Sequence, residues 1–205
     1  MTDLPTRDRI RALAGELYVL RGHDGFSFGD LATAIGVTRA NIHHHFGSKQ
    51  RLMEELIEGF ATDAEARIAQ LWAGGEARFA DRLTRQVEDL RRFHRRFNPR
   101  PEDRNVWSPI ARLRLDLPVL GAPAAAALER VDRAYDRDLR HAVGQAVAAG
   151  ELRLSTPVGD VSRILRATLL SCGPMTQDSG RFEEVEALFA ALGRIIAAAW
   201  GPRAG

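Results

Sequence analysis

The segment from Leu31 to Lys49 constrains the fold of this chain most, because it holds two short helical patterns that meet at a glycine. Its apolar side chains are those of Leu31, Ile35, Val37, Ile42 and Phe46. All of them can face one small core if the chain reverses direction at Gly36. Glycine adopts the left-handed backbone of such a reversal without strain. The pattern therefore predicts two short helices packed against each other.

Each of these helices has residues that suit its first turn. Ser27 is followed three residues later by Asp30, a pairing that can cap the first helix with reciprocal hydrogen bonds, and Thr38 can cap the second. Once the apolar face is packed, the second helix turns a polar set to solvent, consisting of Arg39, Ala40, Asn41, His43 and His44. Hydrogen-bond donors and short side chains suit the base edges and phosphates of DNA. The segment therefore predicts a helix-turn-helix that reads DNA.

The second helix and the residues after it resemble a known family. Thr-Arg-Ala-Asn-Ile-His-His-His-Phe, followed by Gly-Ser-Lys, is similar to the DNA-binding domain of TetR-family repressors, over roughly Thr6 to Gly59. The pairs that match are Gly36-Val37, His45-Phe46 and Ser48-Lys49. His43 departs from the pattern, because the family usually places a tyrosine there, whose phenol reaches a phosphate or a base.

The resemblance implies which side chains contact DNA. Arg39 is expected to read a base, since guanidinium pairs with guanine in a bidentate fork, and a phosphate contact is the alternative. Asn41 pairs with adenine or bonds to nearby backbone, and Ala40 is small enough to touch a thymine methyl. Phosphate contacts are expected from Ser27, Thr38, His43 and Lys49, and His44 and His45 complete the expected DNA-binding set.

The charge balance excludes a polycation that binds DNA indiscriminately. Lysine and arginine number 29 and aspartate and glutamate 27, which gives a formal net charge of +2 over 205 residues. Any affinity for nucleic acid must therefore come from a local patch. The length fits one ordinary domain plus a small one.

Helical periodicity continues along the whole chain, and no segment reads convincingly as a strand. A first helix begins near Thr6 and ends before Gly22, and Ser48 caps a long helix that ends at Gly74. The further helices are expected at 79–98, 106–115, 124–149, 157–172 and 182–200, with a turn at 118–123. The predicted fold is all-α.

Two domains are expected. Residues 1–49 form a three-helix DNA-binding domain, and residues 50–205 form a larger helical domain for effector binding and dimerisation, with the helix 50–72 linking the two. In the TetR family the last two helices pair with their copies in a second subunit. The candidate interface here consists of Val161, Leu165, Thr168, Leu169, Leu188, Leu192, Ile195 and Ala199. A two-fold homodimer implies a roughly palindromic operator.

A small-molecule effector site is expected among the middle helices. Aromatic walls and a few polar groups come from Phe93, His94, Phe97, Trp107, Arg112, Arg114, Tyr135 and Met175. Core packing explains most aromatic residues at helical spacing equally well. The hypothesis is that a partly apolar ligand binds there and shifts the dimer to a half-site spacing that no longer fits DNA.

No cofactor or metal site is expected. Three successive helical side chains diverge by about 100°, so His43, His44 and His45 cannot converge on one ion. Cys172 is the only cysteine, which excludes an intramolecular disulfide; it is an inert packing residue or, as an alternative, a redox sensor. No apolar run approaches the ~20 residues of a membrane span, and a cytoplasmic location is expected.

These observations together predict a transcriptional regulator. The expected function is a repressor that an effector releases from its operator. The alternatives are a DNA-binding dimer without an effector and an all-α enzyme that uses His94 or Tyr135 as acid or base in the C-terminal cavity. The enzyme is the weaker alternative, because the sequence has no spaced metal ligands, phosphate loop or activated nucleophile.

Overall fold

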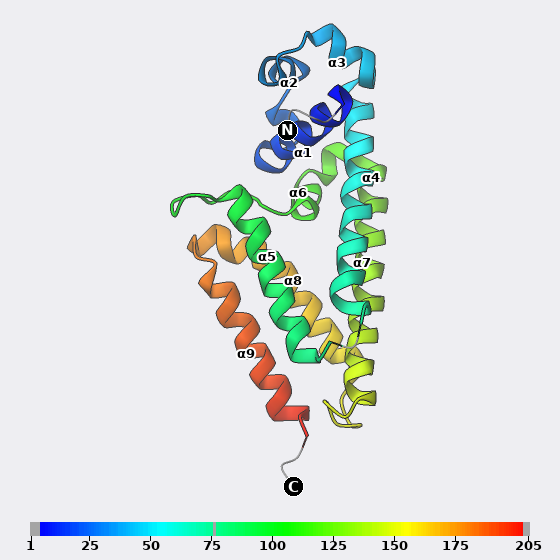
Figure 1. Ribbon diagram of the computed structural model, residues 1–205, viewed down its shortest axis with the longest axis vertical. Coiled ribbons are helices and arrows are strands. Elements are labelled where there is room, and N and C mark those ends of the chain that lie inside the picture. Colours follow the sequence, from blue (N-terminus) through cyan, green and yellow to red (C-terminus); the bar gives the residue numbers. More distant parts are fainter. Residues whose placement is uncertain (1–4, 76, 203–205) are drawn as a thin grey trace. The chain divides into compact units, whose positions relative to one another are not determined.

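The computed structural model describes residues 5–75 and 77–202, and the regular elements within these ranges are all helices (Figure 1). The predicted all-α fold is confirmed. The chain forms two compact units, which we describe separately. Unit 1 consists of residues 1–63 and 106–129, and unit 2 consists of residues 64–105 and 130–205. None of the helices in the described ranges has both the length and the apolar character needed to span a membrane.

Unit 1 contains the expected helix-turn-helix. Its elements are α1 (Thr6–Arg21), a 3-10 helix (His23–Gly25), α2 (Phe28–Ile35), α3 (Arg39–Phe46), the first part of α4 (Lys49–Ile68) and α6 (Pro109–Leu115). In Figure 1, α1, α2 and α3 are the blue helices beside the first turns of α4. The first four helices begin and end close to where the sequence predicts them.

One small core holds these helices together. Leu31 and Ile42 are fully buried and Phe46 is 3% exposed, so α2 and α3 pack through the predicted positions. Ile35 and Val37 lie half-buried at the edge of this core. Burial of each large aliphatic side chain contributes roughly 1.5–3 kcal/mol, which is enough to hold helices of eight residues that would not be stable alone.

The boundary of unit 1 differs from the domain boundary that the sequence predicts. The first turns of α4 pack on α1, where Phe60 and Leu56 lie close to Gly15. The chain also returns to unit 1 at residue 106, and α6 packs against α1. A division at residues 49 and 50 could not include this segment, because it is distant in the sequence.

Unit 2 is built from long helices. It takes in the end of α4, a single π-helical turn (Ala69–Ala73), α5 (Phe79–Phe97), most of α7 (Leu117–Ala148), α8 (Val158–Ser179) and α9 (Glu183–Trp200). Within this unit α9 packs on both α5 and α8. The fully buried Trp72 donates from its indole nitrogen to Oε1 of Gln86, 2.8 Å away, and thereby joins the π-helical turn to α5.

Two helix boundaries in the second half of the chain were predicted wrongly. Residues 118–123 were expected to form a turn, whereas helical structure already begins at Leu117 and is interrupted only at Gly121, where φ is 60° and ψ is −141°. The following Pro123 is compatible with the first turn of the helix that continues from there, because this position needs no amide donor.

Helix α8 runs beyond its predicted end at Cys172, straight through Pro174. The proline removes the amide donor to the Leu170 oxygen, and nearby hydroxyls donate to other main-chain oxygens of the helix. Thr176 Oγ1 lies 2.9 Å from the Gly173 oxygen, and Ser179 Oγ lies 2.8 Å from the Met175 oxygen. The helix ends instead at Gly180, where φ is 70°. A Gly-Pro pair is a helix-stop signal in sequence, and tertiary packing overrides it here.

Candidate nucleic-acid interface

The predicted caps of α2 and α3 are both present. Ser27 Oγ accepts from the Asp30 amide at 3.3 Å, and the Asp30 carboxylate accepts from the Ser27 amide at 2.7 Å. Thr38 Oγ1 accepts from the Asn41 amide at 3.1 Å. At Gly36 φ is 77° and ψ is 38°, which is the left-handed turn that the pattern requires. The two helices are therefore fixed by short-range bonds.

The polar face of α3 is exposed. Arg39 and Ala40 in its first turn and His43 and His44 in its second are exposed, whereas Asn41 and His45 are half-buried. Thr38 is exposed, and its hydroxyl hydrogen remains able to donate after its oxygen has capped the helix. The first turn of α3 thus presents a guanidinium, a methyl group and a hydroxyl to solvent, together with the positive end of the helix.

Asn41 does not make the hydrogen bond to nearby backbone that is one of its two expected contacts. Its Oδ1 atom is buried and has no hydrogen-bond partner within the described residues. A bidentate contact with adenine needs both the oxygen and the nitrogen of the amide at the base edge. The side chain would therefore have to rotate outward to read a base.

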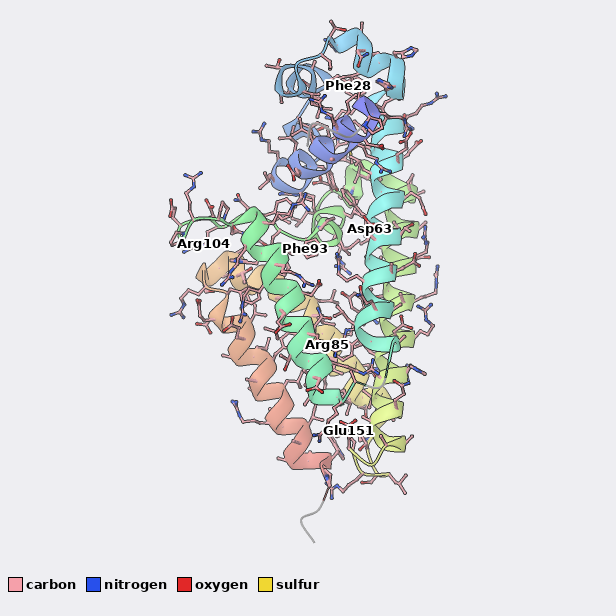
Figure 2. All side chains as sticks on the ribbon, in the orientation of Figure 1. Phe28, Asp63, Arg85, Phe93, Arg104 and Glu151 are labelled. Atoms are coloured by element: carbon pink, nitrogen blue, oxygen red, sulfur yellow. The ribbon has the colours of Figure 1, made fainter. Side chains whose placement is uncertain are left out.

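The His43 ring contacts neighbouring residues of α2 and of the end of α3. It makes an edge contact with Phe28, which Figure 2 labels, at 4.8 Å between ring centroids. Its Nδ1 lies 3.1 Å from the Gly47 carbonyl oxygen, to which it can donate. A neutral ring that donates from Nδ1 has only an acceptor at Nε2, whereas a tyrosine hydroxyl can donate to a phosphate.

Lys49 and Ser27 make intramolecular bonds that the sequence analysis did not predict. The Lys49 ammonium donates to the carbonyl oxygens of His23 and, at 2.7 Å, of Phe26, and it lies 4.7 Å from the Phe26 ring centroid. This is an inward contact to the loop between α1 and α2 and not the outward contact expected for a phosphate ligand. The Ser27 hydroxyl similarly donates to Asp30 at 2.7 Å. These bonds to Ser27 lower the pKa of the Asp30 carboxyl, which favours the charged cap.

The three successive histidines diverge as expected. The His44 and His45 rings are 5.6 Å apart between centroids and inclined at 63°. In the described part of the chain, no group of three or more histidine, cysteine, aspartate or glutamate side chains is arranged to hold a metal ion.

The residues expected around an effector are divided between the two units. Phe93, His94, Phe97, Tyr135 and Met175 belong to unit 2, and Trp107, Arg112 and Arg114 belong to unit 1. In unit 2 burial lowers the pKa of His94, whose ring lies 5.2 Å from that of Phe182, and Phe93 lies under the Arg67 guanidinium at 4.2 Å. A neutral histidine beside aromatic rings fits either core packing or a partly apolar site.

Arg112 is not free to meet an anionic ligand as the sequence suggests. Its Nε donates to the Val19 carbonyl oxygen at 3.0 Å and its Nη2 donates to the Leu20 carbonyl oxygen at 3.3 Å. The guanidinium therefore closes the C-terminal end of α1. No sequence signal could have shown this bond, because more than ninety residues separate the partners.

Among the described residues of unit 2, two hollows are lined by residues other than those expected around an effector. A groove of about 370 Å³ lies between α5 and α9, with Leu83, Val87 and Phe189 among its lining residues. A second hollow of about 420 Å³ lies beside Phe79, Arg82 and the end of α7. The expected effector residues thus do not coincide with either volume.

Cys172 has the environment of a packing residue. It is fully buried, and burial raises the pKa of its thiol to about 12. Its Sγ lies 3.1 Å from the Thr168 carbonyl oxygen. A thiol in this state is a poor nucleophile, which favours the inert alternative over the redox sensor.

Most of the residues expected at a subunit interface are buried within one chain. Val161, Leu165, Thr168, Leu169 and Leu192 are at most 8% exposed, so their side chains already have intramolecular partners. Ile195 is 61% exposed, and Leu188 and Ala199 are half-buried. The sequence analysis missed Ile164 and Leu170, which are 48% and 39% exposed. No apolar stripe could have identified them, because residues six positions apart lie about 120° apart around a helix.

Comparisons with known proteins agree with this geometry. Residues 10–56 match the family model described as "Bacterial regulatory proteins, tetR family". The HTH-type transcriptional repressor KstR2 of Rhodococcus jostii (strain RHA1) is 29% identical over 69 residues, which are 34% of this chain and 34% of the repressor. The likeness to this curated relative thus spans about a third of its length.

Solved structures share the fold of nearly the whole chain. A TetR-family transcriptional regulator from Agrobacterium tumefaciens has a TM-score of 0.76 and 23% identity, and covers 92% of this chain and 96% of its own. A TetR transcriptional regulator from Chloroflexus aurantiacus J-10-FL has a TM-score of 0.77 and 20% identity over 97% of both chains. These structures show the fold of the chain, and residues 10–56 are similar to the TetR family of bacterial regulatory proteins.

Proposed function

We propose that this protein is a sequence-specific DNA-binding transcriptional regulator that inserts α3 into the major groove. The observation that carries the proposal is the exposed first turn of α3, where Arg39 and Ala40 follow the capping residue Thr38. A guanidinium at this place can pair with guanine in a bidentate fork, and the small Ala40 lets the helix approach a thymine methyl. The Thr38 hydroxyl and the positive helix end suit a phosphate.

The other residues expected to contact DNA differ in how far their side chains are free to do so. His44 and His45 are proposed to contact the DNA backbone, and Asn41 is proposed to reach a base after rotating outward. His43 lies on the same face of α3, but its neutral ring with Nδ1 directed to Gly47 lacks a donor for a phosphate. The Ser27 hydroxyl would have to leave Asp30 to reach a phosphate. Lys49 is left out of the phosphate set, because its ammonium is directed to two carbonyl groups.

Selection of duplexes from a random DNA library at near-physiological salt tests the proposal. We expect an enriched, roughly palindromic sequence, because two copies of α3 in a two-fold dimer would read half-sites about one helical turn apart, ~34–36 Å. Enrichment of no sequence at any salt concentration would contradict the proposal, since sequence-independent binding comes from phosphate contacts alone.

The dimer itself is proposed to form through α8 and α9. Ile164, Leu170 and Ile195 are large apolar side chains that one chain leaves exposed on these two helices. In Figure 1, α9 runs back along α8, so these two helices lie side by side. A four-helix contact of this kind would bury the exposed apolar side chains.

Replacing Ile195 with glutamate should convert the dimer to a monomer and weaken binding to the selected palindrome by about 100-fold or more, because a charge at a buried subunit interface costs several kcal/mol. Light scattering coupled to size-exclusion chromatography measures the mass. Leu154→Glu is the matched control, since Leu154 is 92% exposed and lies outside both helices. Equal masses for both variants would contradict the proposed interface.

Repression relieved by a small effector is the proposed mode of regulation. A curated relative is named a repressor, which supports repression here. The effector is proposed to bind in unit 2 near Phe93, which Figure 2 labels on α5, with His94, Phe97, Tyr135 and Met175. A thermal-shift screen with metabolite classes tests this against the alternative of a DNA-binding dimer without an effector. A ligand that raises the melting temperature and weakens operator binding supports the effector.

The same proposal includes an operator on double-stranded DNA, a cytoplasmic location and no enzymatic activity. The support is that the relatives are transcriptional regulators. A regulator of this kind needs no cofactor to bind its operator.

A further inference from the structure

The loop between α1 and α2 is fixed by side chains from helices that are distant in the sequence. This loop runs from Gly22 to Phe26 and connects α1 to the helix-turn-helix. On one side, Lys49 at the start of α4 donates to the carbonyl oxygens of His23 and Phe26. On the other side lies α6, from the segment that returns to unit 1 at residue 106.

Arg112 in α6 and Asp116, the residue directly after that helix, make the contacts on that second side. Arg112 donates to the Val19 and Leu20 carbonyl oxygens at 3.0 and 3.3 Å, and Asp116 accepts from the His23 amide at 2.8 Å. The last carbonyl groups of a helix have no donors within it, and the first amide groups of the next helix have no acceptors. Arg112 therefore satisfies the end of α1, and Asp116 satisfies the start of the 3-10 helix.

Gly22 shows how closely α6 approaches. Its φ is 75°, and a Cβ atom built on it would lie 3.1 Å from the nearer Asp116 carboxylate oxygen and 3.5 Å from Nη1 of Arg112. A side chain at this position would strain the backbone and also press on both Arg112 and Asp116. The loop conformation and the approach of α6 thus depend on the same glycine.

The contacts also lie in a partly desolvated place. Tyr18 is fully buried, and burial, followed by the nearby Asp116 carboxylate, raises the pKa of its hydroxyl well above the usual value. Arg112 and Asp116 are both half-buried. Charge-assisted hydrogen bonds between partly buried groups are stronger than those on an open surface.

We infer that Arg112 and Asp116 form a clasp that positions the helix-turn-helix for DNA, although neither residue belongs to it. This inference rests on the proposed function. The clasp holds the loop that connects α1 to α2 and α3. It therefore fixes the orientation of α3 relative to α1. Arg112 and Asp116 are positioning residues, and neither is required to touch DNA.

The clasp predicts a particular pattern of losses in the full-length protein. Arg112→Gln and Asp116→Ala should each weaken binding to the duplex selected by the parent by about tenfold or more, because each removes charge-assisted hydrogen bonds. The slope of log Kd against log salt and the selected sequence should stay unchanged, because no phosphate or base contact is removed. Arg112→Lys, which keeps one donor group, should recover part of the affinity.

Hydrogen exchange gives a readout that needs no DNA. In Asp116→Ala the His23 amide should exchange at least about tenfold faster than in the parent, because its acceptor is gone. Arg114→Gln is the matched control, since Arg114 is exposed on the same helix and does not belong to the clasp. All binding is measured well below each variant's melting temperature, so a merely destabilised but folded variant would bind like the parent.

The outcomes separate the two proposals. Clasp variants that bind the selected duplex like the parent would overturn the clasp and leave the proposed function standing. A parent that selects no duplex would overturn the proposed function, and with it a positioning role in DNA reading. A shallower salt slope in Arg112→Gln would also overturn the inference, because it would make Arg112 a phosphate ligand.

Discussion

The helices of the helix-turn-helix and helix α5 of unit 2 differ in where their first amide groups find hydrogen-bond acceptors. In residues 27–51 each helix start is capped from three residues away, by Ser27, Thr38 and Ser48. Helix α5 has no side-chain cap of its own, and its Phe79 amide donates instead to Glu151, 72 residues along the chain, at 2.9 Å. Figure 2 labels Glu151 near the end of α7.

The buried Arg82 is a second example of a side chain in unit 2 that bonds to distant residues. Its guanidinium donates to the carbonyl oxygens of Trp72, Gly75 and Ala77 and to Oε1 of Gln145, at 2.6, 2.9, 3.1 and 2.9 Å. One side chain thus closes the end of the preceding helix, the connecting loop and α7 together. The comparison indicates that the helix starts of residues 27–51 are capped locally, whereas the start of α5 depends on long-range bonds.

Loss of Arg82 should therefore have the largest effect on stability. Arg82→Met leaves several buried carbonyl groups without donors, and we expect a loss of about 3 kcal/mol in the free energy of unfolding, or roughly 6–12 °C in the melting temperature. Calorimetry measures both. Arg85→Met, at the exposed position three residues later that Figure 2 labels, should change the melting temperature by no more than about 1 °C. Equal melting temperatures for the two variants would remove the contrast between the regions.

Loss of a local cap should cost less, and its cost should depend on pH. The Asp30 pKa is lowered in the folded protein, so the charged cap stabilises above the unfolded pKa, and this stability is lost as the pH falls through the folded pKa. Asp30→Asn should lower the melting temperature at pH 7 by about 2–4 °C. The difference from the parent should shrink steadily as the pH falls below about 4. A difference independent of pH would show that the carboxylate charge has no part in the cap.

His43 gives the smallest expected effect and sharpens the comparison within α3. With Nδ1 directed to the Gly47 carbonyl, a neutral His43 has no donor left for a phosphate. His43→Tyr should therefore tighten binding to the selected duplex by about two- to tenfold at pH 8, since one hydrogen bond is gained. His43→Phe is the control that keeps the ring and removes the hydroxyl. Equal binding by the two variants would place position 43 away from the DNA.

The same contrast explains what the sequence could predict. The caps at Ser27 and Thr38 and the turn at Gly36 were predicted because each partner lies within a few residues. The hydrogen bonds of Arg112 and Lys49 were not predicted, because their partners are distant in the sequence. The partners of Arg112 lie 92 and 93 residues away, and those of Lys49 lie 23 and 26 residues away. The helix predicted at 157–172 was too short, because a sequence does not show that tertiary packing carries a helix through Pro174.

The interface residues show a further limit of periodicity. An apolar stripe along α8 identified Leu165 and Leu169, but periodicity does not tell whether such a stripe faces the core of its own chain or a second subunit. The structure buries these two and leaves Ile164 and Leu170 exposed. The effector residues were scattered over both units for the same reason, since apolar spacing identifies burial and not a cavity.

The most direct test of the account is to repeat the duplex selection with Arg39→Ala beside the parent, with Arg85→Ala as the matched arginine outside the helix-turn-helix. We expect the parent to enrich a palindrome, and Arg39→Ala to lose preference at one symmetric pair of positions and bind about 10- to 100-fold more weakly. Arg85→Ala should select the parental sequence. An unchanged palindrome for Arg39→Ala would contradict the claim that the exposed first turn of α3 reads the DNA.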